Sequence, residues 1–247
     1  MNTYLSDGTF LSLLTLIASL FKLNIEPNDI KSKDNYIPNL LDTAKEIKFA
    51  CDNILKFMIK VYSLDIINSI YYVFLSTEKD KEMIIYDFLK QAIKLKKKVF
   101  YYRNIDSVDK VLKIRKRVLG EAHKLKGFLR FKKMKNNFYY AEINPTNDCL
   151  EIVANHFKKR LKNEIWIIKD VNREKYVIYD LHNIYYLSSE NIKSLNINYS
   201  IEEASVEELW KSFFATVAIK TRENKKCQMN FMPKKYWKYI IEMEDET

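Results

Sequence analysis

Three side chains of the kinds that transfer protons in enzymes, Glu121, His123 and His156, lie in the middle of the sequence. Glu121 and His123 form a carboxylate–imidazole pair, a combination used in general acid–base catalysis. On a regular helix a separation of two residues corresponds to about 200°, so these two side chains would point apart. They can share a target only if the helix unwinds before Gly127. A structural, hydrogen-bonded role for His123 is the alternative.

His156 and Arg160 are four residues apart and are expected on one flank of a helix. A guanidinium beside an imidazole disfavours the protonated imidazole. The neutral ring suits a hydrogen bond to a phosphate or a base better than it suits general acid catalysis. The alternative is ordinary packing of the helix against a sheet.

Arginines and amides form the rest of the polar set. Arg130 alternates in phase with Phe128 and Lys132, so we expect it on an exposed strand face or in a polar pocket. Asp170 and Arg173 flank a predicted hairpin turn and most simply pair with each other.

The segment TRENKKCQMNFMP, residues 221–233, is expected to be a polar loop between helices. It carries Arg222, Asn224 and Gln228. Such side chains can contact phosphates or base edges, but they can equally bond to neighbouring backbone groups.

Positive charge is concentrated in one window. The formal net charge is +10, and residues Lys94 to Lys135 hold 16 Lys and Arg against three acids, Asp106, Asp109 and Glu121. The remainder has 26 of the 42 basic and 29 of the 32 acidic residues. This distribution predicts a polyanionic ligand such as nucleic acid, and a merely solvated basic face is the alternative.

The predicted nucleic-acid contacts share a cationic or amide side chain, and seven of the eleven lie within this window. They are Lys110, Lys113, Arg117, Lys124, Lys126, Arg130, Lys132, Arg160, Arg222, Asn224 and Gln228. Interleaved aromatic residues could stack on bases, although core packing is the commoner role of such residues. They are Phe100, Tyr101, Tyr102, Phe131, Tyr139 and Tyr140.

Hydrophobic periodicity predicts an α+β fold, with a helical N-terminal half followed by a small antiparallel sheet of hairpins packed with helices. The helices are expected at Phe10–Phe21, Leu40–Lys60, Ser63–Leu75, Ile84–Lys98 and Ser107–Lys126, with an irregular connector between Pro27 and Pro38 that can include a short strand. The regions are expected to be 1–120 and 121–247, as two domains or one continuous domain. Gly120 and Gly127, two of only three glycines, are expected where backbone geometry requires glycine.

The second half is predicted to contain two hairpins. The first joins Phe128–Met134 to Phe138–Ile143 through Asn136 and Asn137, which tolerate positive φ. The second joins Ile165–Lys169 to Lys175–Tyr179. Further helices are expected after Leu150, over Glu202–Ile219 and after Pro233.

Several chemistries are excluded by motif. The sequence has no GxGxxG, GxxxxGK[ST], HExxH, GxSxG or paired CxxC, which argues against Rossmann, P-loop, zincin and α/β-hydrolase sites. Neither a metal nor a cofactor is expected. Three separated cysteines suit a reducing cytoplasm, and the apolar run at 10–21 is too short to span a bilayer.

Several segments, taken in order, resemble one family. They are YLSDGTFLSLL at 4–14, EAHKLKGFLRF at 121–131, NHFKKR at 155–160, WIIKDVNR at 166–173 and the tail at 209–237. The chain is similar to an uncharacterised DNA metabolism protein family whose members accompany a radical-SAM protein assigned to DNA repair. In some members the domain is fused to a uracil-DNA-glycosylase-like domain.

The resemblance implies a cytoplasmic DNA-binding accessory protein that works with a radical-SAM or glycosylase-type partner. Neither partner chemistry is expected in this chain, because it has no CxxxCxxC motif and no glycosylase-type water-activating motif. Two alternatives remain open. One is an enzyme acting on nucleotides or nucleic-acid ends through a His/Arg pocket, and the other is a pure protein-interaction adaptor.

Overall fold

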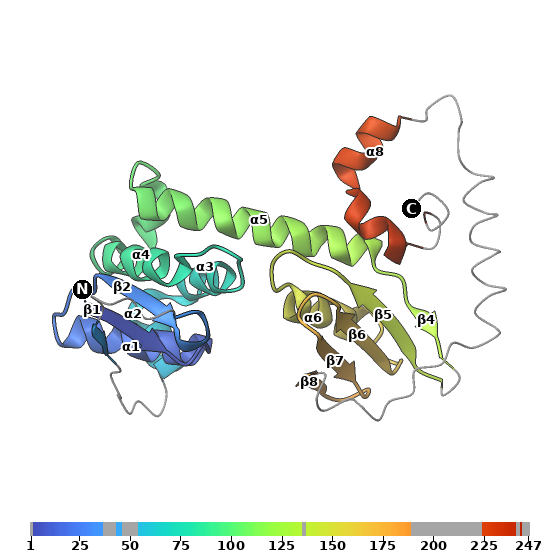
Figure 1. Ribbon diagram of the computed structural model, residues 1–247, viewed down its shortest axis with the longest axis horizontal. Coiled ribbons are helices and arrows are strands. Elements are labelled where there is room, and N and C mark those ends of the chain that lie inside the picture. The colour runs from blue at the N-terminus through green and yellow to red at the C-terminus, as the bar shows by residue number, and fades with distance from the viewer. Residues whose placement is uncertain are drawn as a thin grey trace. The chain divides into compact units, whose positions relative to one another are not determined.

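The computed structural model confirms the predicted α+β class (Figure 1). It describes residues 2–36, 43–45, 54–134, 137–188, 224–240 and 243. The chain divides into two compact units, Met1–Leu119 and Gly120–Thr247. The boundary between the two falls inside one helix, α5 (Asp106–Phe128).

The first unit contains a parallel sheet of order β2-β1-β3. Its strands are β1 (Asn2–Ser6), β2 (Asp29–Ser32) and β3 (Thr43–Lys45). The central strand β1 pairs with both neighbours, for example Tyr4 with Ile30 and Tyr4 with Lys45. Tyr4 and Ile30 are almost completely buried, so this sheet belongs to the core of the unit.

The first half is mainly helical, as predicted, but the prediction did not include its three-stranded parallel sheet. Strand β1 was not expected, and Thr43–Lys45 is a strand where the Leu40–Lys60 helix was predicted. Only the expected short strand after Pro27 corresponds to an observed one, β2. Parallel strands of three to five residues give little periodicity, and their pairing partners lie tens of residues away.

The helices of the first unit otherwise follow the apolar periodicity. They are α1 (Phe10–Lys22), α2 (Ile54–Tyr62), α3 (Leu64–Phe74) and α4 (Lys81–Leu95), with short 3-10 segments η1 (Lys33–Asn35) and η2 (Lys96–Tyr101). Helix α1 buries Leu13, Leu14 and Ile17 completely. Its first turn is closed by Thr9, whose side chain accepts a hydrogen bond from the Ser12 amide at 3.2 Å.

Gly8 is the glycine that the backbone requires. Its φ is 87°, and a Cβ atom at this position would lie 3.0 Å from the Ser32 hydroxyl oxygen and 3.1 Å from an Asp34 carboxylate oxygen. Gly120 and Gly127 have no positive φ, and beyond the adjoining backbone of their own helix no atom lies within 4 Å of the place where a Cβ would stand. The expectation that geometry demands glycine at these two positions is therefore wrong.

We expect Gly8→Ala to lower the free energy of unfolding by at least about 1 kcal/mol, because alanine is strained at positive φ and has no room. The matched control is Gly120→Ala, an exposed position inside α5, where alanine should raise stability by about 0.5–1 kcal/mol. Thermal unfolding followed by far-UV circular dichroism measures both. Equal stability of the two variants would show that the Gly8 turn relaxes without cost.

The second unit is built on a mixed five-stranded sheet of order β4-β5-β6-β7-β8. The strands are β4 (Lys132–Lys133), β5 (Tyr139–Ile143), β6 (Trp166–Asp170), β7 (Lys175–Tyr179) and β8 (Ile184–Ser188). Both predicted hairpins are present as the antiparallel pairs β4–β5 and β6–β7. Asn137 has φ 54°, as expected for the first turn.

The sheet differs from the predicted set of hairpins in two respects. Strand β8, which pairs with β7, was not predicted. Strands β5 and β6 are parallel and are joined by helix α6 (Leu150–Arg160). A parallel pair needs such a crossover, because a tight turn cannot reverse the chain twice. As Figure 1 shows, α6 lies against the sheet, where its Val153, Ala154 and Phe157 are buried.

Trp166 is the centre of this core and is fully buried. The rings of Phe131 and Tyr179 have centroids 6.2 and 5.3 Å from that of Trp166, and Phe131 also meets Phe157 edge-on at 5.0 Å. The core therefore joins the segment after α5 to the sheet and α6.

The C-terminal part contains a helix that was expected to be loop. Helix α8 (Lys225–Phe231) lies within the predicted polar loop, and the 3-10 segment η5 (Lys234–Tyr239) follows Pro233 as predicted for a short last helix. The predicted Glu202–Ile219 helix lies outside the described residues. Within the described part of the chain, no helix has the length and apolarity needed to cross a membrane.

Candidate nucleic-acid interface

Helix α5 is continuous through the whole basic segment, so it does not unwind before Gly127. Its buried stripe includes Val108, Val111, Val118 and Leu125. Because this stripe occupies one side of the helix, the Lys and Arg side chains emerge on the other sides. Helix periodicity thus turns a run of basic sequence into an exposed charged surface.

Three predicted DNA contacts on α5 already have acidic neighbours. Lys110 pairs with Asp106 and Lys113 pairs with Asp109, each at 2.6 Å, and Arg117 pairs with Glu78. The three basic side chains are at least half exposed. Exposed ion pairs contribute little stability, so these three cations can exchange an acid for a phosphate at small cost.

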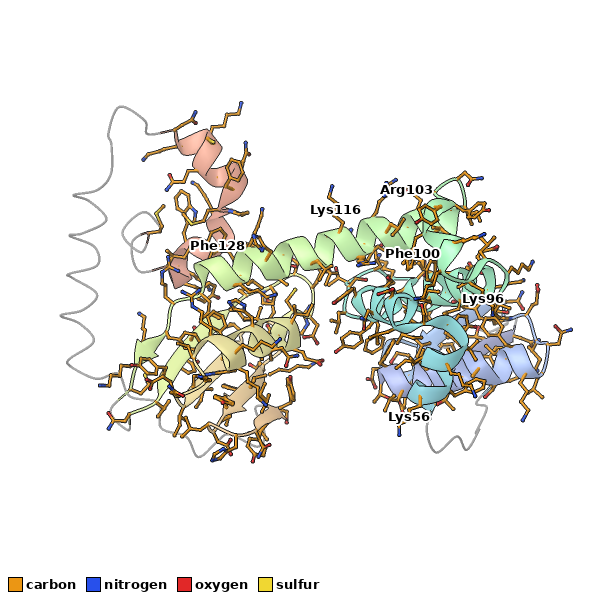
Figure 2. All side chains as sticks on the ribbon, turned by 180° about the vertical axis from the view of Figure 1, so that it is seen from behind. Lys56, Lys96, Phe100, Arg103, Lys116 and Phe128 are labelled. Carbon is orange, nitrogen blue, oxygen red and sulfur yellow. The ribbon has the colours of Figure 1, made fainter. Side chains whose placement is uncertain are left out.

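Several other cations of the window form no ion pair within the described residues. In the first unit these exposed side chains are Lys96, Lys97, Lys98, Arg103 and Lys116. Figure 2 shows Lys116 extending from α5 and Arg103 lying just before the helix. Two of the three acids of the window are in the first unit, and both are paired on α5. Most of the positive charge in the part of the window that belongs to the first unit is therefore uncompensated.

In the second unit, Lys126, His156 and Arg160 influence one another electrostatically. Burial lowers the pKa of His156, and the charges of Lys126 and Arg160 lower it further. The imidazole is therefore neutral at pH 7, as predicted from its spacing to Arg160. The ring also meets Phe157 edge-on at 5.0 Å. Lys124, which is half-buried, shares this end of α5 and forms no ion pair within the described part.

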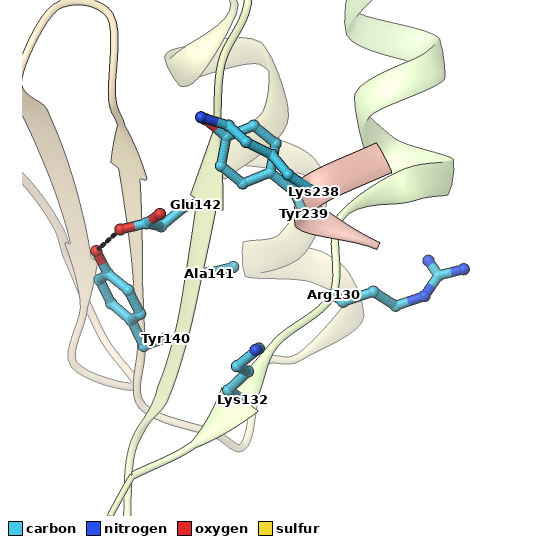
Figure 3. Close-up of a pocket in the computed structure, with 7 residues that line it drawn as sticks. All are labelled: Arg130, Lys132, Tyr140, Ala141, Glu142, Lys238 and Tyr239. Atoms are coloured by element: carbon cyan, nitrogen blue, oxygen red, sulfur yellow. Dashed lines mark hydrogen bonds between the residues drawn. The ribbon is translucent and has the colours of Figure 1, made fainter. Parts of the chain in front are cut away.

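Arg130 and Lys132 border a pocket of about 90 Å³ in the second unit (Figure 3). Its lining residues are Arg130, Lys132, Tyr140, Ala141, Glu142, Lys238 and Tyr239. Three of these are cations and one is an acid, so the pocket carries net positive charge. Such a lining suits a phosphate-sized anion.

The polar groups of this pocket differ in their hydrogen-bond partners. Glu142 accepts a hydrogen bond from the Tyr140 hydroxyl at 2.7 Å. The guanidinium of Arg130 points away from the pocket in Figure 3 and donates to the Gly127 carbonyl at 2.9 Å. The Tyr239 hydroxyl is buried and makes no hydrogen bond of good geometry, but it interacts with the Lys238 ammonium and raises the pKa of that group.

Glu121 is held by five hydrogen bonds and does not face solvent. Its carboxylate accepts from the amides of Thr146 at 2.7 Å and Asn147 at 2.9 Å, and from the Asn147 side chain at 2.6 Å. Lys235 donates at 2.8 Å and the Tyr236 hydroxyl at 3.0 Å. A carboxylate occupied in this way serves as a structural link rather than as a proton acceptor.

The pKa of Glu121 reflects this environment. Burial by itself raises the pKa, but the hydrogen bonds from Lys235, Asn147 and Thr146 outweigh burial and lower it to about 2. Burial and the neighbouring Glu121 charge raise the pKa of Tyr236, so its hydroxyl remains a donor. Glu121 is thus ionised throughout the physiological range.

The structure does not bring the two imidazoles to the pocket. His123 is exposed on α5, and His156 is half-buried on α6. Neither lines the pocket that Arg130 borders. Arg222, the other arginine proposed beside them, lies outside the described residues.

The remaining predicted residues make local contacts. Asn224 caps α8 by accepting from the Cys227 amide at 2.9 Å, and Gln228 contacts the Met243 sulfur at 3.6 Å. Asp170 and Arg173 pair at 3.1 Å, as expected for residues that flank a turn. Among the described residues, no three His, Cys, Asp or Glu side chains are grouped as a metal site would require.

Sequence reasoning missed Lys235, Lys238 and Tyr239. The signal that could have identified them is the alternation of basic and aromatic residues in KKYWKY, residues 234–239. Lys235 and Lys238 lie over the rings of Tyr236 and Tyr239 at 4.6 and 4.7 Å. Such stacked cations hold their ammonium groups beside the site.

Fold and surface together define an α+β protein that presents exposed cations on α5 and η2 and has a cationic pocket beside β5. Residues 79–242 match the family described as a domain of unknown function, DUF4130. The chain belongs to this family. No curated protein and no solved structure matches the chain.

Proposed function

We propose that the protein is a DNA-binding accessory factor in DNA repair or modification. The observation that carries the proposal is the group of exposed cations on η2, on α5 and in the turn between them that form no ion pair within the described residues, namely Lys96, Lys97, Lys98, Arg103 and Lys116. Neutralising phosphates releases counterions from DNA, and this release drives binding. A surface without compensating acids is suited to this role.

An accessory role is favoured over catalysis by the state of Glu121. This carboxylate is one of the three acid–base candidates in the sequence, and its hydrogen bonds are directed to the β5–α6 loop and η5. The enzyme alternative is supported by the cationic pocket alone, whose lining includes Lys132 and Lys238.

The same proposal includes a partner that performs the chemistry, a radical-SAM or a glycosylase-type protein, in the cytoplasm. Helix α8 supports a docking role, because it has no buried residue and exposes Phe231 by 71% and Met229 by 37%. Aromatic residues and methionine are enriched in protein interfaces. The carrier of DNA affinity and the carrier of partner affinity would then be separate surfaces.

We expect Lys116→Glu to weaken duplex DNA binding roughly tenfold at about 0.1 M salt, because one phosphate contact is lost and a repulsion is added. The slope of log affinity against log salt should become shallower by about 0.9. Fluorescence anisotropy with a labelled duplex, at salt concentrations of about 50 to 200 mM, measures both quantities.

The matched control is Lys56→Glu, which makes the same charge change on α2. Lys56 is also exposed, and Figure 2 shows it well away from Lys116. If both variants weaken binding equally, the effect comes from net charge and not from this surface. Absence of binding by the unaltered chain to single-stranded, duplex and lesion DNA, with and without the partner, would refute the proposed function.

A further inference from the structure

In the segment between α4 and α5, the side chain of Tyr101 is exposed to solvent. Val99 is fully buried, and the ring of Phe100 packs on Phe88 with centroids 6.1 Å apart. The amide of Tyr102 donates to the Val99 carbonyl at 3.1 Å. These contacts fix the backbone on both sides of Tyr101, whose side chain is 85% exposed. The exposed ring is therefore attached to an anchored segment.

Positive charge surrounds this ring. Lys96, Lys97 and Lys98 precede it and Arg103 follows it, and all four side chains are exposed. No acid occurs between Leu95 and Ile105. In the described part of the chain none of the four cations forms an ion pair. Asp106, the next acid along the chain, is paired with Lys110.

The Tyr101 side chain forms no hydrogen bond or ring contact with any described residue. Tyr102, beside it, is 41% exposed. The sequence analysis predicted core packing for most of the aromatic residues that are interleaved with the basic ones. That assignment fits Phe100, Phe131 and Tyr140, which are packed, but not Tyr101 and Tyr102.

We propose that residues 96–103 bind unpaired nucleotides of a DNA strand, with the Tyr101 ring stacked on a base and Lys97, Lys98 and Arg103 contacting the flanking phosphates. This inference rests on the proposed function and adds the strand state to it. In a duplex the base faces are already stacked on one another, so an exposed ring finds a partner only on an unpaired base. Cations on both sides of the ring suit a backbone that passes over it.

The test compares a single strand of about 12 nucleotides with a blunt duplex of the same sequence, using anisotropy and the full chain. Tyr101→Ala should weaken single-strand binding about tenfold and leave duplex binding unchanged, because stacking on the ring is lost. Tyr101→Trp should retain or increase the affinity. The control Phe57→Ala removes a ring that is 52% exposed on α2, outside the basic window, and should change neither affinity.

A second pair of variants tests the phosphate contacts. Lys97→Ala and Lys98→Ala should each make the single-strand salt dependence shallower by about 0.7. Circular dichroism confirms that each variant is folded.

The outcomes separate the two proposals. Duplex binding by the unaltered chain, combined with single-strand binding that Tyr101→Ala leaves intact, overturns this inference and leaves the proposed function standing. Equal losses on both DNAs also overturn it, since they show that the ring does not distinguish strand states. No binding of either DNA overturns both proposals. Selective capture of an acidic protein partner by residues 96–103 in place of DNA likewise overturns this inference.

Discussion

We expect the replacement of Glu121 with glutamine to lower the free energy of unfolding of the second unit by about 3 kcal/mol. The folded-state pKa of about 2 lies below the ordinary value of 4.5, and each pKa unit corresponds to about 1.4 kcal/mol. Folding therefore favours the ionised carboxylate by about 3 kcal/mol. The side chain is only 9% exposed, so solvent screens little of this energy.

Glutamine cannot reproduce the five contacts. All five partners of Glu121 donate, and an amide offers one acceptor oxygen and places two N–H groups against the other donors. The Asn147 and Tyr236 donors are buried and would be left without an acceptor away from water, whereas Thr146 and Lys235 are exposed and can bond to water. The loss should therefore exceed that of an ordinary hydrogen bond.

The same carboxylate gives the unit an acid-sensitive contribution. Because the folded-state pKa is depressed, the stabilisation is fully present above about pH 4.5 and is lost as pH falls toward about 2. The stability of the unaltered chain should decline through this range, whereas the Glu121→Gln variant should lack that part of the decline.

Urea unfolding followed by tryptophan fluorescence measures this effect, because all three tryptophans lie in the second unit. Glu164→Gln is the control, since Glu164 is exposed and forms no ion pair in the described part of the chain. A loss at Glu121 no larger than at Glu164 would mean that water replaces the five contacts, and the link between α5, the β5–α6 loop and η5 would be unimportant.

We expect Asp170→Ala to lower the free energy of unfolding of the same unit by about 3 kcal/mol. Asp170→Asn should lower it by less than about 1 kcal/mol. The Asp170 side chain is fully buried and accepts from the Asn172 amide at 3.0 Å, the Arg173 amide at 3.3 Å and the Arg173 guanidinium at 3.1 Å. Alanine leaves the two amides without their acceptor and removes the counter-charge of the half-buried guanidinium, which keeps only the Pro145 and Thr146 carbonyls as acceptors.

Asparagine is tolerated because the charge of Asp170 is not favoured by folding. Burial raises its pKa, and the opposing effect of Arg173 is smaller. The neutral amide retains an acceptor oxygen for the turn, where Asn is also a preferred residue. Glu121 and Asp170 are thus two buried carboxylates with opposite responses to a neutral isostere, because donors outweigh burial at one and burial outweighs donors at the other.

The measurement is again urea unfolding with the tryptophan signal. Asp180→Ala is the control, because Asp180 also follows a strand and accepts from the His182 and Asn183 amides, but at a solvated turn. Its effect should be smaller than that of Asp170→Ala. If Asp170→Asn is as damaging as Asp170→Ala, the ion pair itself stabilises the turn and the stated balance at Asp170 is wrong.

Local patterns identified most elements of the second unit. Apolar residues every three to four positions predicted α6, and alternating residues around Asn137 predicted β4–β5. These patterns are informative because each element buries one of its faces, and the residues of that face recur at a fixed spacing within the element itself. Strand β1 was missed because its stability depends on pairing with residues 29–32 and 43–45.

Some features of the candidate site were likewise predictable from local sequence, and others were not. The cations of α5 and the electrostatic effect of Arg160 on His156 were predictable, because charge and helical spacing are local properties. The role of Glu121 was not, since Lys235 and Tyr236 lie 114 and 115 residues further along the chain.

The sequence by itself determined the α+β class, the basic window and the helices that display it, because periodicity and charge need no distant partner. Only the tertiary structure decided which charged groups are used internally and which remain available. It placed Glu121 among five donors and left Tyr101 and the neighbouring lysines exposed. The physical reason is that burial and hydrogen-bond partners depend on segments far apart in sequence, and these segments meet only after folding.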